Sequence, residues 1–212
     1  MIATLEQNMV ERRTEMGANK SQVAFLAESA QAGNRSSFEK LVGMFQAKIF
    51  RMAYYRTGSH MDAEDLTQDI FVKAFKGLPK LKDVNLFRPW LFSIALNSVR
   101  DFKRKKRILL FFGTESESKN FESADLDIHE NPQALSHLIR EEFWQHVRHF
   151  TKNLSRWERE VFLLRFLDQL SIKEIAHVLY KSESAVKTHL YRSLRKFKDN
   201  PELALLLQGE TP

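Results

Sequence analysis

Hydroxyl and basic side chains recur at helical spacing near the C-terminus, between Glu183 and Phe197. At about 100° per residue, one face of a helix over this segment presents Ser184, Lys187, Thr188, Tyr191, Arg192 and Arg195. An Arg guanidinium can donate two hydrogen bonds to the O6 and N7 atoms of guanine, whereas Lys and Thr bind phosphates. Such a face predicts contact with the DNA major groove, although an isolated helix could carry it as an ordinary solvated surface.

The preceding residues predict a helix-turn-helix motif. Ser171 and Glu174 form a capping box that begins a first helix, and the buried stripe of that helix would be Ile172, Ile175, Ala176 and Leu179. A short turn over 180–182 leads to the second helix, whose inward face would be Val186, Leu190 and Phe197, with Leu194 at its edge. Upstream, Ser155 and Glu158 form another capping box. Two helices joined by such a turn favour DNA binding over a merely solvated face.

A run of five cations, Lys103–Arg107, ends a predicted helix that begins at Trp90. These side chains match a phosphate backbone, although a helix C-terminus also favours positive charge, so part of their role can be structural. Cations interleaved with aromatic side chains precede the helix, namely Lys80, Lys82, Phe87 and Arg88. That mixture could hold unstacked bases, whereas Trp90 itself fits a core position better.

The segment from Asp62 to Lys76 predicts a helix with two different faces. Its apolar face would be Ala63, Leu66, Ile70 and Ala74. The opposite face would be Asp65, Gln68, Asp69 and Val72, with Phe75 nearby. Because phosphates would repel this acidic face, we interpret it as a docking face for a basic protein partner. A solvated face with one tolerated Val is the alternative.

The sequence contains none of the usual catalytic patterns. It has no P-loop, no dinucleotide-binding glycine motif, no HExxH and no cysteine. Glu142, His146 and His149 have the spacing of one helix face and could be a metal site, but the charged residues around them favour a solvated face. We therefore expect no enzymatic activity, no metal and no cofactor.

The composition favours a helical protein of the cytoplasm. Hydrophobic residues make up 43% of the 212 residues, whereas Gly (7) and Pro (5) are few. The net charge of +6 is compatible with a polyanionic partner but does not prove one. The absence of cysteine suits a reducing compartment, and we expect neither a signal peptide nor insertion into a membrane.

Changes in composition along the chain predict an all-α fold of two small helical domains. Helices are expected over Phe38–Ala53, Asp62–Gly77 and Trp90–Arg107, with a break at Gly58-Ser59. Acidic residues dominate 113–133, a stretch too long for an ordinary loop inside one domain. The predicted division is a flexible N-terminal extension over 1–20, a first domain over 21–108, an acidic flexible linker over 109–133, a helix-turn-helix domain over 134–200 and a tail over 201–212.

Three motifs, over 62–75, 90–97 and 154–198, resemble in order and spacing those of extracytoplasmic-function (ECF) RNA polymerase sigma factors. The resemblance covers roughly residues 22–198. It implies an alternative sigma factor that binds core RNA polymerase and directs promoter recognition, DNA melting and initiation. The first domain would be sigma region 2 and the second sigma region 4. The sequence departs from the family at the long N-terminal extension, at Tyr180–Ser182, which lacks a frequent Gly, and at His189, where Arg is commoner.

The resemblance also implies roles for matching positions. The residues that would bind the polymerase clamp are Asp65, Gln68, Asp69 and Val72. Those near the promoter −10 element would be Lys80, Lys82, Phe87, Arg88, Asn97, Arg100, Lys103 and Arg104. Those that read the −35 element would be Ser184, Lys187, Thr188, His189, Arg192 and Arg195. The acidic linker would follow the active-site channel of the polymerase.

The partners implied are core RNA polymerase, promoter DNA and an anti-sigma protein that covers the polymerase-binding faces. Regulation through expression alone is equally allowed. The rival function is a helix-turn-helix regulator that binds DNA without polymerase. That rival needs a ligand-binding or phosphoacceptor domain, and residues 21–107 lack the strand-helix alternation of one.

Overall fold

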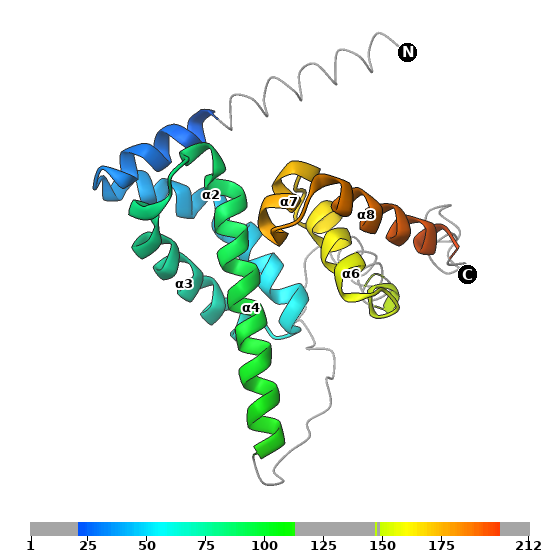
Figure 1. The fold of residues 1–212 in the computed structure, drawn as a ribbon. Helices are drawn as coiled ribbons and strands as arrows, with labels where there is room; N and C mark the ends of the chain where they lie inside the picture. The colour runs from blue at the N-terminus through cyan, green and yellow to red at the C-terminus, as the bar shows by residue number, and fades with distance from the viewer. Residues whose placement is uncertain (1–20, 113–146, 148, 200–212) are drawn as a thin grey trace, which may run out of the picture. The chain divides into compact units, whose positions relative to one another are not determined.

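The computed structural model describes residues 21–112, 147 and 149–199, and within these ranges the chain is helical, with no strand. The described residues fall into two units, the first over 21–112 and the second over 147–199 (Figure 1). The prediction of an all-α fold with two helical domains is confirmed. The first unit consists of a helix through residues 21–31, α2 (Arg35–Thr57), α3 (His60–Gly77), the 3-10 turns Leu78–Lys80 and Val84–Leu86, and α4 (Phe87–Phe112).

The ends of α2 and α3 are set by local hydrogen bonds. Asn34 caps α2 by accepting a hydrogen bond from the Ser37 amide at 3.1 Å. Gly58 ends that helix in the left-handed region, at φ 74°, which glycine adopts without steric cost. Ser59 then caps α3. The predicted break is confirmed, and α3 begins two residues before the predicted Asp62.

Helix α4 is longer than the predicted Trp90–Arg107. It begins at Phe87 and ends at Phe112, so Pro89 lies in its first turn, where a missing amide costs no helical hydrogen bond. No helix-breaking residue follows until Gly113, and the helix includes the first four residues of the predicted linker range 109–133. Its C-terminal turns project past α2 and α3 (Figure 1).

The core of the first unit is built from one face of each helix. The fully buried side chains include Leu41, Ile49, Met52, Ala63, Ile70, Ala74, Leu91 and Phe92. Burying a Leu, Ile, Met or Phe side chain contributes roughly 1.5–3 kcal/mol. The predicted apolar face of α3 is confirmed, because all four of its residues are buried.

The loop between α3 and α4 is fastened to the rest of the first unit. The side-chain amide of Gln31 donates to the carbonyl oxygens of Leu78, at 2.8 Å, and Leu81, at 2.7 Å. Trp90 packs against Gly77, where a Cβ atom would lie 3.1 Å from the indole ring. The loop that carries the predicted −10 contacts is thus held in one position by contacts to two helices.

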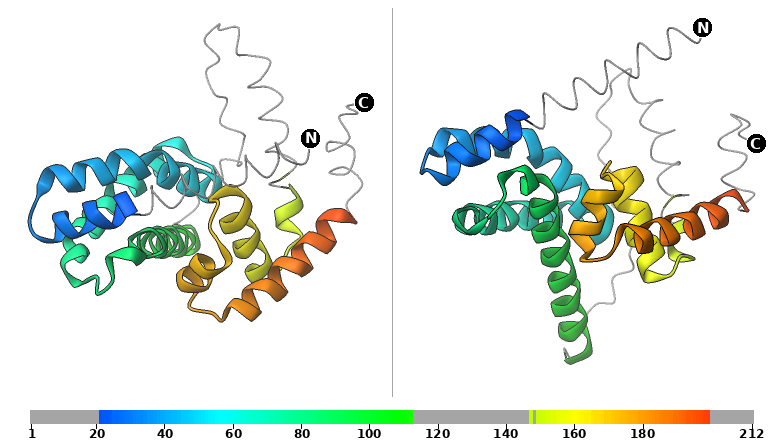
Figure 2. Two further views of the ribbon diagram at one scale, coloured as in Figure 1. Left: turned by 90° about the horizontal axis from the view of Figure 1, so that it is seen from above. Right: turned by 45° about the horizontal axis from the view of Figure 1, so that its top comes forward.

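The second unit contains a helical turn over 149–152, α6 (Arg156–Phe162), the π-helical turn Leu163–Leu167, α7 (Ile172–Leu179) and α8 (Glu183–Lys198). Both predicted capping boxes are confirmed: the Ser155 amide donates to Glu158 at 3.0 Å and the Ser171 amide donates to Glu174 at 2.8 Å. The short turn that joins α7 to α8 is visible in Figure 2. The predicted helix-turn-helix geometry is therefore present.

Tyr180 occupies the position in this turn where glycine is frequent. It ends α7 with φ 53° and ψ 47°, the left-handed conformation. A residue with a Cβ atom is destabilised there by about 1 kcal/mol relative to glycine. Its amide still satisfies the carbonyl groups of Ala176 and His177, so the turn keeps its shape without the glycine.

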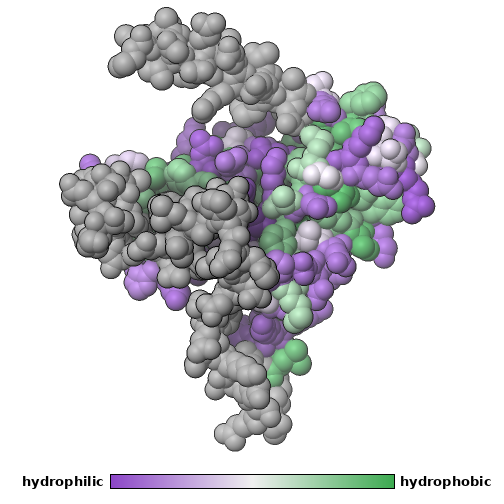
Figure 3. All heavy atoms as spheres, turned by 180° about the vertical axis from the view of Figure 1, so that it is seen from behind, coloured by the Kyte–Doolittle hydropathy of each residue, from purple (hydrophilic) through white to green (hydrophobic). Residues whose placement is uncertain are grey.

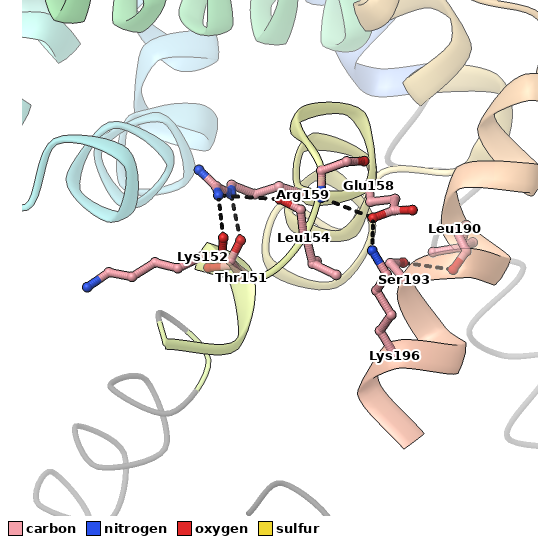
Figure 4. A network of polar contacts seen from close by, with 9 residues as sticks. Thr151, Lys152, Leu154, Glu158, Arg159, Leu190, Ser193 and Lys196 are labelled. Carbon is pink, nitrogen blue, oxygen red and sulfur yellow. Dashed lines mark hydrogen bonds and ion pairs between the residues drawn. The ribbon is translucent and has the colours of Figure 1, made fainter. Parts of the chain in front are cut away.

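Aromatic side chains and one ion pair hold α8 against the rest of the second unit. The Phe150, Phe162 and Phe197 rings pack with centroids 5.3 to 5.9 Å apart. Beside them, Lys196 of α8 donates to the buried Glu158 of α6 at 2.7 Å (Figure 4). This pair ties the end of α8 to α6.

The Glu158 carboxylate is stabilised in its charged form. Hydrogen bonding from Lys196 is the main cause of a lowered pKa, and burial opposes it. A carboxyl group whose pKa is lower in the folded state stabilises the fold above its unfolded pKa. That contribution is lost as the pH falls through the folded pKa.

We therefore predict that Glu158→Gln lowers the free energy of unfolding near pH 7 by about 1 kcal/mol. The difference from wild type should shrink as the pH falls through the lowered pKa of the folded-state carboxyl, because the wild-type side chain is then protonated. Urea unfolding followed by tryptophan fluorescence at several pH values measures both. Glu183→Gln, an exposed change on α8, is the control. A difference that persists unchanged at low pH would contradict this role.

Candidate polymerase-binding and DNA-binding surfaces

The outer face of α8 is exposed as predicted. The exposed side chains are Ser184, Lys187, Thr188, Tyr191, Arg192 and Arg195. The Thr188 hydroxyl donates to the Ser184 carbonyl at 3.0 Å, which fixes its rotamer and leaves oxygen lone pairs for a donor. The set combines three cations with three hydroxyl groups on one side of one helix.

His189 does not share this exposure. Its side chain is half-buried, and Nδ1 is buried with no hydrogen-bond partner among the described residues. Burial, followed by the nearby charges of Lys181 and Arg192, lowers the pKa of His189. The ring therefore lies at the boundary between the two faces of α8, and its contact with the −35 element stays a prediction.

The inner face of α8 contains a residue that the sequence pattern did not reveal. Val186 is buried as predicted, but Ser193 is also completely buried. Its hydroxyl donates to the Leu190 carbonyl at 2.7 Å, which removes the cost of burying it. Leu194, placed at the edge by its spacing, is 39% exposed.

Helix α3 presents the predicted acidic and apolar face to solvent. The exposed residues on this face are Asp65, Gln68, Asp69, Val72 and Phe75. Val72 is 51% exposed and Phe75 47%, so apolar surface adjoins the two carboxylates. Lys73 donates to the Ser98 hydroxyl of α4 at 2.8 Å and helps to hold this orientation. Figure 3 shows that apolar surface gathers on the first unit between hydrophilic areas.

The residues predicted near the −10 element divide by exposure. Those exposed are Lys80, Lys82, Asn97, Lys103 and Arg104, and those half-buried are Arg88 and Arg100. Phe87 is only 1% exposed, and its ring packs 5.7 Å from both the Phe45 and Trp90 rings. Its prediction as a DNA contact is therefore wrong, because Phe87 begins α4 and points into the core.

The run Lys103–Arg107 is exposed along its length, but two of its cations have acidic partners within the first unit. Lys106 lies 3.1 Å from Asp62 at the start of α3, and Arg104 lies 3.2 Å from Asp101. The Arg104–Asp101 pair is largely in solvent, where such contacts stabilise by about 0–1 kcal/mol, whereas the Asp62 side chain is only 17% exposed. These cations can thus pair with Asp62 and Asp101 of the first unit, or exchange these carboxylates for phosphates.

Two cations of α2 were not among the residues predicted from the sequence. Lys48 and Arg51 are half-buried, and the Lys48 ammonium lies 5.3 Å from the Phe45 ring centroid. Their spacing of three residues was the available signal, since it places both on one helix face. The sequence could not pair them with Arg88 of α4, which lies far away along the chain.

The possible metal site can be followed only in part. Glu142 and His146 lie outside the described residues, and His149 is exposed. Across 21–112, 147 and 149–199, no group of three or more His, Cys, Asp or Glu side chains has metal-binding geometry. None of the helices in these ranges is long and apolar enough to cross a membrane.

Comparison with known proteins identifies both units. A family model described as Sigma-70 region 2 matches residues 41–108, and one described as Sigma-70, region 4 matches residues 148–197. The chain is 30% identical to the ECF RNA polymerase sigma factor BldN of Streptomyces coelicolor, over 87% of this chain and 67% of that protein. It is 32% identical to the RNA polymerase sigma factor YlaC of Bacillus subtilis, over 79% of this chain and 93% of YlaC.

Solved structures agree with this assignment. CnrH, determined in complex with the cytosolic domain of CnrY, has a TM-score of 0.61 and 25% identity, over 90% of this chain and 99% of that chain. The sigma factor RpoE of Bartonella quintana, determined with the anti-sigma factor NepR, shares the fold at a TM-score of 0.53 and 20% identity, over 82% of this chain and 98% of that chain. Both family models and the relatives at 30% identity or more agree, and the chain belongs to the ECF sigma factors, which are alternative sigma factors of transcription initiation and not enzymes.

Proposed function

We propose that this sigma factor binds the clamp of core RNA polymerase through α3 and promoter DNA through α4 and α8. The observation that carries the proposal is the exposure of two faces of opposite character. The α3 face combines Asp65 and Asp69 with the apolar Val72, whereas the α8 face presents Arg192 and Arg195. The first complements a basic protein surface and the second complements DNA.

The division of labour follows from the chemistry of each face. On α3, the exposed Val72 and Phe75 side chains supply apolar area for a protein interface, and the carboxylates around them set its register. On α8, Arg192 can bind a guanine edge, while Lys187 and Thr188 bind phosphates. The proposed −10 contacts are Lys80, Lys82, Arg88, Asn97, Arg100, Lys103 and Arg104, without Phe87.

The proposed domain roles follow the same division. Residues 21–108 would act as region 2 and residues 134–200 as region 4, joined by the acidic stretch over 109–133. We place the protein in the cytoplasm, where its polymerase is. We propose no role for the N-terminal extension over 1–20 or for the tail over 201–212.

We infer an anti-sigma protein as a further partner. RpoE of Bartonella quintana was determined with the anti-sigma factor NepR. The exposed Val72 and Phe75 side chains of α3 are apolar surface that an anti-sigma protein could cover, because apolar side chains in solvent are stabilised by a covering partner. Such a partner would compete with polymerase for the face of α3.

Transcription in vitro tests the proposed function. Core polymerase with the purified chain, on a library of genomic fragments, should start transcripts at a small set of promoters that core polymerase alone ignores. The same experiment identifies the −10 and −35 sequences. Tight operator binding by the chain alone, with no binding to core polymerase, would support the rival regulator.

We predict that Asp69→Lys abolishes binding to core polymerase, because it reverses a charge in the centre of the α3 face. Affinity should fall at least tenfold, with unchanged helical content by circular dichroism. Glu39→Lys, an equal charge change at an exposed position of α2, is the matched control and should retain binding. Unchanged affinity of the Asp69 variant would refute the assignment of this face to the clamp.

Arg192→Ala should weaken binding of the holoenzyme to its preferred −35 sequence by roughly 1–3 kcal/mol, because the variant cannot donate two hydrogen bonds to a base. Binding to fragments with a substituted −35 base should change little. Competition binding on paired fragments measures the difference, with the exposed Lys198→Ala at the end of α8 as the control. An equal loss on all sequences would instead make Arg192 a phosphate contact.

A further inference from the structure

We propose that Lys48 and Arg51 of α2 and Arg88 of α4 together form a binding site for a backbone phosphate of promoter DNA. The site rests on the proposed function, since it adds a phosphate contact beside the residues assigned to the −10 element. It extends the DNA-binding surface of the first unit from α4 and its preceding loop onto α2.

The three cations are brought together by the packing of α2 against α4. Lys48 and Arg51 lie three residues apart on one face of α2, and both are half-buried. The Lys48 ammonium lies 5.3 Å from the centroid of the Phe45 ring. That ring packs 5.7 Å from Phe87, the residue next to Arg88. A contact between buried aromatic rings thus places the start of α4 beside Lys48.

Arg88 has the same kind of surroundings. Its guanidinium lies 5.9 Å from the ring centroid of Phe92, which is fully buried. Lys48 and Arg88 therefore lie over aromatic rings of the core rather than at the ends of extended side chains in solvent. Half-buried cations interact with a bound anion more strongly than fully exposed ones, because less water screens the charges.

The electrostatics show that positive charge is concentrated at this place. Burial lowers the pKa of Lys48, and the charges of Arg88 and Arg51 lower it further. The pKa of an ammonium group falls when neighbouring cations make its charged form less favourable. A bound phosphate would reverse this effect, because its negative charge stabilises all three cations at once.

A nucleic-acid phosphate fits this cluster better than a protein surface. The protein surface that complements Asp65 and Asp69 must be basic, and a basic surface would be repelled by three cations. Two arginines and one lysine offer the fork-shaped and point donors that bind phosphate oxygens. Arg88 also follows, along the chain, the loop that carries the exposed Lys80 and Lys82, which are themselves proposed to contact the −10 region.

The test uses full-length variants assembled with core polymerase. Lys48→Gln with Arg51→Gln removes two cations of the cluster. Arg35→Gln with Lys40→Gln is the matched control, since it removes one Lys and one Arg at exposed positions of the same helix. The probe is a promoter fragment recovered in the transcription experiment and opened at the −10 element. Binding is measured by fluorescence anisotropy over a range of salt concentrations.

The cluster variant should bind the probe roughly tenfold more weakly near 0.15 M salt. The slope of log K against log salt concentration should be shallower by about 0.7–0.9 for each phosphate that the variant no longer binds. The control should match wild type. Lys48→Met keeps an unbranched side chain packed on Phe45, so this variant should fold normally. Its affinity for the probe should also fall, which shows that the weaker binding does not come from unfolding. Affinity and salt dependence equal to the control would overturn the proposal.

Neutral methylphosphonates locate the phosphate. Replaced one at a time along the probe, they should weaken wild-type binding at one or two positions where the cluster variant is insensitive. If the variant loses as much affinity as wild type at every replaced phosphate, the proposed site is overturned. Weakened binding of the variant to core polymerase would also overturn it and assign the cations to a protein partner. If wild-type chain and polymerase start no transcripts, the proposed function itself fails, which is a separate result.

Discussion

The packing of each helix through a single apolar face is the constraint on which the rest of this structure depends. A small unit of a few helices can cover only one side of each, so the opposite side stays in solvent. In α3, complete burial of Ile70 turns Asp69 outward. In α8, burial of Val186 turns Arg192 outward. The faces proposed to bind polymerase and DNA are therefore direct consequences of how the cores are filled.

Polar contacts refine this arrangement more than they create it. Gln31 fastens the loop before α4 through two backbone carbonyl groups, and Glu158 joins α6 to Lys196 on α8. Exposed pairs such as Arg104 with Asp101 add little stability. Their value lies in geometry, because each holds a loop or helix end close to a proposed binding surface.

Local sequence signals were sufficient for most helix boundaries and for both capping boxes. The Ser171 and Glu174 pair needs only side chains three residues apart, so it could be recognised without tertiary information. The ends of α4 were harder, because a helix continues until something stops it, and nothing in Ile108–Phe112 does so. Tyr180 adopts a left-handed conformation that no local preference of tyrosine predicts. Tyr180 is 81% exposed, and the conformation accompanies the hydrogen bonds of its amide to the Ala176 and His177 carbonyl groups.

The sequence by itself determined the helical class, the two-unit organisation and the outward faces of α3 and α8, because period and spacing within one helix decide which residues share a face. Only the tertiary structure decided what happens between helices. It buried Phe87 against Phe45, turned His189 partly inward, and brought Lys48 close to Arg88. These results depend on which helices pack together and at what register, and that information is distributed over the whole core rather than written in any one segment.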